Sequence, residues 1–287
     1  MDSRDIKVEV PHTLTPLKDI FNLQKGLIEE YIKIEKMKKY PLNVNLKDNQ
    51  TLLKDFTSRV IEELAEGYES LGKVAGLTEK NQLWFQDYSS KEYQEMLGHL
   101  QNVSEEFADA LHFFVELLVY INIDEEDIRG YIDKYVFKNM SEDTLEGKSI
   151  LSWCMIAGDS LLYADGVIDY DTKINPMDLL RNLDSNEGDR KLLQMGRFYH
   201  KVVFTEQLPK ILWDVTYHLN LSRNFLRNKP WKQSQVFVNE QGYQEEVISS
   251  FLRFMGVFSF FNISDSEVFY LYFKKNQVNQ FRIRSKY

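Results

Sequence analysis

The chain has 287 residues, of which 43% are apolar and 28% charged, the composition of a globular protein large enough for an extensive core. Its formal net charge of −9 argues against long nucleic acid as the main partner, because duplex binding draws heavily on Lys and Arg. Cys154 is the single cysteine, and the first residues lack the apolar core of a signal peptide. We therefore expect a cytoplasmic protein and, since no apolar stretch is long enough to cross a bilayer, no membrane association.

Helical periodicity dominates the chain, and strands at the spacing of βαβ units are absent. The helices that the pattern predicts cover residues 17–37, 51–72, 91–102, 104–122, 124–138, 147–165, 176–182, 188–203 and 205–228. Loops are expected over 73–88 and 166–187, and β-type residues predict extended segments over 234–239 and 266–274.

These elements predict an all-α helical bundle in one domain over residues 1–287. We expect its core helices within about 17–138 and 188–255, and an inserted or mobile region at about 140–187. The remaining segment, 266–287, is expected to be partly extended.

Two acidic patterns are candidates for chemistry. Glu63 and Glu66 are three positions apart, so on a helix they share one face. Such a pair, taken alone, more often marks a solvated polar face than a site. The other pattern is more informative because its helix is otherwise apolar almost all round.

In that helix Asp109, His112 and Glu116 join Glu105 in one narrow stripe, with Glu106 at its edge. A buried helix does not carry unpaired carboxylates, because burying each charge costs roughly several kcal/mol. The stripe therefore either reaches solvent narrowly or faces cations.

Packed together, the two helices would bring four carboxylates into one oxygen-rich group: Glu63, Glu66, Glu106 and Asp109. Hard oxygen ligands suit Mg²⁺, or Mn²⁺, rather than zinc. Carboxylates in such a group can also orient or deprotonate an attacking water.

A basic segment, Lys-Asn-Gln-Val-Asn-Gln-Phe-Arg, occupies 275–282. With the earlier Glu-x-x-Glu, and the Glu-x-x-Asp that continues into Ala-Leu-His-Phe, it makes the chain resemble the dimeric all-α dUTPases of the MazG-like pyrophosphohydrolases. The resemblance implies a homodimer that hydrolyses a deoxynucleoside triphosphate to the monophosphate and pyrophosphate with Mg²⁺, or with Mn²⁺. It also implies that residues 266–287 bind the nucleotide.

Carried over residue by residue, the resemblance implies that the metal ligands are Glu63, Glu66, Glu106 and Asp109. Glu66, or Glu63 beside it, would position the attacking water. The residues that would bind the nucleotide and its phosphates are Gln24, Lys275, Asn279, Arg282 and Tyr287. Gln24 would read the base, since an amide can donate and accept on one pyrimidine edge. His112 would be a structural hydrogen-bonding residue beside the site.

The leading substrate by this resemblance is dUTP. Ile28 stands where the family tends to have Asn, so dCTP, or a broader or modified nucleotide, stays open. Lys286 stands where the family has Gly, which implies that the closing segment over the phosphates differs in this chain. The alternative from another class is an all-α interaction protein that has the fold without catalysis.

Overall fold

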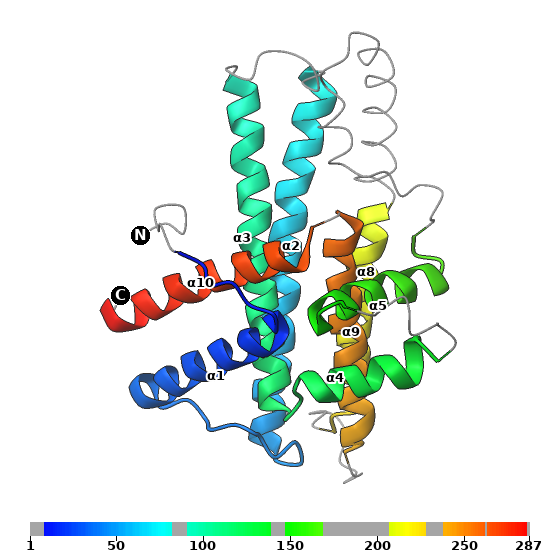
Figure 1. Ribbon diagram of the computed structural model, residues 1–287. Coiled ribbons are helices and arrows are strands. Elements are labelled where there is room, and N and C mark those ends of the chain that lie inside the picture. The colour runs from blue at the N-terminus through cyan, green and yellow to red at the C-terminus, as the bar shows by residue number, and fades with distance from the viewer. Residues whose placement is uncertain are drawn as a thin grey trace.

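The computed structural model describes residues 9–81, 91–138, 147–168, 207–227, 238–261 and 263–285. Every regular element in these ranges is a helix, which confirms the predicted all-α fold (Figure 1). In chain order they are α1 (Pro16–Glu35), α2 (Lys47–Asn81), α3 (Lys91–Tyr120), α4 (Glu125–Tyr131), the π-helical turn η3 (Ile132–Val136), α5 (Ile150–Ala164), α8 (Leu208–Ser222), α9 (Glu240–Phe260) and α10 (Asp265–Ser285).

The two long helices α2 and α3 lie side by side and run antiparallel (Figure 1). Both are longer than their sequence pattern predicts. The expected loop after residue 72 is helical as far as Asn81, because Val74 and Ala75 continue the buried apolar face. The expected break near residue 103 is absent: α3 is continuous there, because Val103 and Phe107 continue its buried apolar face.

The expected extended segment over 266–274 is helical, because it belongs to α10. Its run of apolar and aromatic residues buries Val268, Phe269 and Tyr272 at helical spacing. The helix start is fixed by reciprocal contacts: the Ser264 backbone N–H donates to Glu267 Oε2 over 2.7 Å, and the Glu267 backbone N–H donates to Ser264 Oγ over 3.3 Å.

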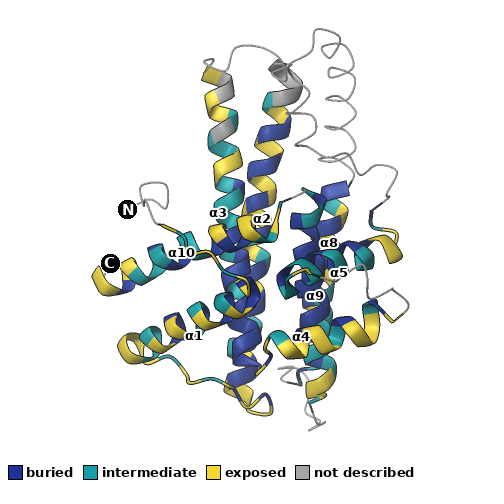
Figure 2. Cartoon of the chain, viewed as in Figure 1, coloured by how far each residue is buried: buried dark blue, intermediate teal, exposed yellow. Residues whose placement is uncertain are grey.

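A second group of helices, α5, α8 and α9, packs beside the α2–α3 pair (Figure 2). Helix α9 is buried along most of its length, and its Phe254 ring stacks on Phe114 of α3 with centroids 5.2 Å apart. Helices α5 and α9 meet at Gly158 and Gly256, where a Cβ on Gly158 would lie 1.9 Å from the Leu252 carbonyl oxygen. Glycine is therefore required at this crossing.

Helix α5 falls within the region expected to be an insertion. Its residues Leu151, Cys154, Ala157 and Leu162 are fully buried in the core. The expected helices at 176–182 and 188–203, together with nearly all of the extended segment at 234–239, lie outside the described residues.

Helices α1 and α10 pack against each other and cross α3 on one side of the α2–α3 pair (Figure 1). This arrangement brings helices from distant parts of the chain against the polar stripe of α3. Within the described ranges, no single helix is long and apolar enough to span a membrane, and only the bent pair α9–α10 meets those criteria jointly.

Candidate functional site

Three of the four predicted carboxylates meet between α2 and α3. Oxygen atoms of Glu63, Glu106 and Asp109 all lie within 4.8 Å of one another, and each side chain is half-buried. Glu63 comes from α2, while Glu106 and Asp109 are three positions apart on one face of α3. We call these three residues the carboxylate group.

A glycine allows the two helices to approach at this level. A Cβ on Gly67 would lie 2.7 Å from Cε1 of Phe107, and 3.5 Å from the Cβ of Glu106. Gly67 lies four positions after Glu63, and Phe107 directly follows Glu106, so this close helix–helix contact and the acidic residues share one level. The absence of a side chain at Gly67 thus positions Glu63 near the acids of α3.

The carboxylate group holds more negative charge than its protein neighbours balance. Burial and the nearby charges of Asp109 and Glu106 raise the pKa of Glu63 to about 8, and its carboxyl shares a hydrogen bond with that of Glu106. Burial, followed by the charge of Asp109, also raises the pKa of Glu106. The pKa of Asp109 is raised by burial despite the nearby Lys275. A bound cation would relieve this repulsion.

Glu66 lies outside the carboxylate group as defined by distance. Its side chain is exposed, one helical turn from Glu63. Its negative charge still contributes to the raised pKa values of Glu63 and Glu106, so Glu66 lies at the solvent side of the same acidic patch.

Helix α10 turns a basic face toward these acids. Lys275, Asn279 and Arg282 follow one another at spacings of four and three, which places them on one side of a helix. Lys275 Nζ lies 2.6 Å from Asp109 Oδ2, and the charge of Arg282 acts to lower the pKa of Asp109. Asn279 is half-buried between them along the helix. The structure therefore brings these three predicted residues together, whereas Tyr287 lies outside the described residues.

Gln24 is 2% exposed, and its amide oxygen is used inside the protein. The hydroxyl of Tyr272 donates to Gln24 Oε1 over 2.6 Å, and His112 Nδ1 lies 3.1 Å from the same oxygen. The His112 ring stacks on Tyr272 with centroids 4.0 Å apart, and its Nε2 lies 3.2 Å from the Tyr272 carbonyl oxygen. Burial lowers the pKa of His112 to about 3, so the imidazole is neutral at physiological pH. This environment matches the structural role expected for His112.

Sequence reasoning did not single out Tyr272, which links α10 to both α1 and α3. The Ser-x-x-Glu pattern at 264–267 was the available signal, because it marks a helix start that would place Tyr272 one turn before Lys275. Glu116, two turns beyond Asp109, belongs to the polar stripe that the sequence predicts on α3. It is 8% exposed, and burial raises its pKa to about 7 against the opposing charge of Arg59.

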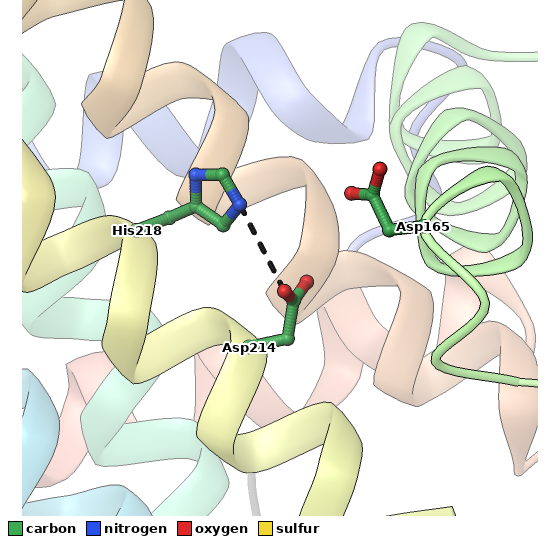
Figure 3. A group of neighbouring side chains, drawn as sticks. All are labelled: Asp165, Asp214 and His218. Carbon is green, nitrogen blue, oxygen red and sulfur yellow. Dashed lines mark ion pairs between the residues drawn. The ribbon is translucent and has the colours of Figure 1, made fainter.

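A second set of potential ligands lies between α5 and α8. Asp165 at the end of α5 and Asp214 and His218 on α8 bring their polar atoms within 4.8 Å of one another (Figure 3). Arg253 is already among them: its guanidinium forms ion pairs with Asp165 and, over 2.7 Å, with Asp214. His218 Nδ1 lies 2.9 Å from Glu246. Because Arg253 bridges both aspartates, we interpret this set as a structural ion-pair network.

Comparisons of the chain with protein-family models, with curated proteins and with solved structures found no match.

Proposed function

We propose that the protein is a magnesium-dependent nucleoside triphosphate pyrophosphohydrolase, with dUTP as the leading substrate. The observation that carries the proposal is the meeting of the carboxylate group with the basic face of α10. Carboxylates can hold a metal ion and basic side chains can pair with phosphates, so the meeting of these two sets suits a metal-bound polyphosphate.

The donors of the carboxylate group fit the proposed metal. Glu63, Glu106 and Asp109 offer only oxygen atoms, which Mg²⁺ and Mn²⁺ prefer. Burial raises the pKa of each carboxyl, joined at Glu63 and Glu106 by the charge of Asp109, and a bound cation would favour the charged forms again. A metal ion bound there would supply charge neutralisation for the phosphates and a lowered pKa for the attacking water.

The remaining roles follow from exposure and position. Glu66 is exposed beside the carboxylate group, so a water approaching from solvent would meet its carboxylate, which would orient that water and accept its proton. Arg282 and Lys275 would bind the phosphates and stabilise negative charge that develops during hydrolysis. Asn279, between them on the same face, would donate a hydrogen bond to the nucleotide.

The surroundings of Gln24 and Ile28 bear on base selection. Ile28 is fully buried, and the amide oxygen of Gln24 already accepts a hydrogen bond from the Tyr272 hydroxyl, with His112 Nδ1 3.1 Å away. A substrate base read by Gln24 would therefore have to replace internal contacts. This observation keeps dCTP or a broader set of nucleotides as the second candidate function, with the same hydrolytic chemistry.

The test is pyrophosphate release from each deoxynucleoside triphosphate, with and without Mg²⁺, by the wild type, Glu66→Gln and Glu69→Gln. Glu69 is exposed on the same helix and pairs with Lys73 over 2.8 Å, so its variant controls for loss of one surface charge. We expect metal-dependent release that is lost in Glu66→Gln and retained in Glu69→Gln, with both variants folded. Wild-type activity in Glu66→Gln would contradict its role.

Absence of release by folded, metal-loaded wild type would instead favour the interaction-protein alternative. The proposed homodimer is checked on the same samples by light scattering after size-exclusion chromatography.

A further inference from the structure

The ammonium of Lys275 forms an ion pair with Asp109, one of the carboxylates that would bind the proposed metal. The Lys275–Asp109 ion pair is 2.6 Å long, and its side chains are 11% and 21% exposed. Among the described residues, Lys275 is the one base in ion-pair contact with Glu63, Glu106 or Asp109. The carboxylate group is thus partly neutralised by a cation that belongs to the protein.

A metal ion and this ammonium compete for the same charge. Mg²⁺ approaches a carboxylate oxygen to about 2.0–2.1 Å and draws on most of its negative charge. Because the Asp109 side chain is only 21% exposed, a metal ion on one of its oxygens and the Lys275 ammonium on the other would repel each other. Metal binding is therefore opposed while Lys275 stays on Asp109.

The Lys275 ammonium can move away from Asp109 into open space beside it. A cavity of about 200 Å³ opens between α3 and α10, lined by Lys275 itself and by Ser104, Glu105, Tyr270 and Lys274. A lysine side chain has a flexible four-carbon stem, so its ammonium can move several ångströms while α10 stays in place. Lys275 also lies on the same face as Arg282, where an anion would meet both bases.

We propose that Lys275 is an internal competitor for the metal, and that an incoming polyphosphate draws its ammonium away from Asp109. The proposal rests on the proposed function, because it takes the carboxylate group as the metal site. Metal and polyanion then bind with positive cooperativity: the anion supplies a new partner for Lys275 and frees Asp109 for the metal. By linkage, each ligand raises the affinity for the other by the same factor.

The test measures binding of Mn²⁺ alone to the full chain, by the electron paramagnetic resonance signal of free Mn²⁺. The proteins are the wild type, Lys275→Met, Lys275→Gln and the control Lys274→Met. Lys274 is the adjacent lysine and lines the same cavity, so its removal alters net charge equally without touching Asp109. The glutamine variant keeps a hydrogen-bond donor beside Asp109 and guards against loss of folding in the methionine variant.

We expect both Lys275 variants to bind Mn²⁺ more tightly than wild type, by a factor on the order of ten, and Lys274→Met to stay close to wild type. Inorganic phosphate should raise the Mn²⁺ affinity of wild type and change that of the Lys275 variants much less. Mn²⁺ binding by wild type that is no weaker than in the Lys275 variants would overturn the competitor role and leave the metal site standing. Absence of Mn²⁺ binding in all four folded proteins would overturn both proposals.

Discussion

Replacing Gly67 with alanine tests whether the close approach of α2 and α3 builds the carboxylate group. The new Cβ would lie 2.7 Å from Cε1 and 3.0 Å from Cδ1 of Phe107. The Phe107 ring cannot simply move aside, because it is 3% exposed and packs edge-on against Phe254 and Phe258. Overpacking of this kind costs about 1–3 kcal/mol of folding free energy.

The same substitution also favours the helix, since alanine is preferred over glycine by about 1 kcal/mol in a helix interior. Gly72→Ala on α2 isolates this second effect, because Gly72 is exposed and a Cβ there would meet nothing within 4 Å. The helix preference cancels between the two variants. Their difference in free energy of unfolding should therefore equal the steric cost alone, about 1–3 kcal/mol with Gly67→Ala the less stable.

Urea unfolding followed by circular dichroism measures that difference, and Mn²⁺ binding measures its consequence for the site. Gly67→Ala should separate Glu63 from Glu106 and weaken Mn²⁺ binding, whereas Gly72→Ala should bind as wild type does. Equal stability and equal Mn²⁺ affinity in the two variants would refute the reasoning.

Three further variants probe the core and its buried charges. Gly158→Ala places a Cβ 1.9 Å from the Leu252 carbonyl oxygen. Because the obstacle is backbone, we expect the free energy of unfolding to fall by at least about 3 kcal/mol in differential scanning calorimetry. A fall of less than about 1 kcal/mol would show that α5 and α9 separate easily. Burial raises the pKa of Glu116 from 4.5 to about 7, so its contribution to stability is complete below pH 4.5 and is lost as the pH rises through 7. Glu116→Gln should remove this pH dependence and gain up to about 3 kcal/mol over wild type at pH 8, and parallel pH–stability curves for the two proteins would contradict that interpretation. Arg253→Met leaves Asp214 without its main partner and should cost about 3–5 kcal/mol in urea unfolding, whereas a neutral effect would mean that Asp214 is neutralised in another way.

The sequence predicted the acidic stripe of α3 well, because an apolar helix with one polar line has few ways to be buried. The stripe was expected to reach solvent narrowly or to face cations, and Asp109 indeed contacts Lys275. His112 and Glu116 show the remaining outcome, in which burial itself suppresses the charge through a shifted pKa. Amino-acid pattern therefore identified which residues share a face, and tertiary packing decided how each one is satisfied.

Helix α10 was harder to predict because its apolar residues come in a short aromatic run. Such a run fits a strand or a buried helix equally well by periodicity alone. The start signal at Ser264 and Glu267 favours the helix, whereas the β-type composition of residues 268–273 favours a strand, and the segment is helical. The burial of Gln24 differs from the base-reading role expected of it, and its partner Tyr272 lies too far along the chain for any local pattern to reveal.

The hydrogen bond between Tyr272 and Gln24 joins residues 248 positions apart, which has consequences for the order of folding. Closing so long a loop is entropically unfavourable until the intervening helices have condensed, whereas the α2–α3 hairpin needs only local contacts. Docking of α10, and with it the delivery of Lys275 to Asp109, is then a late event on the folding pathway. A ligand that bridges α3 and α10 should accordingly slow the unfolding rate of the protein and leave its folding rate almost unchanged.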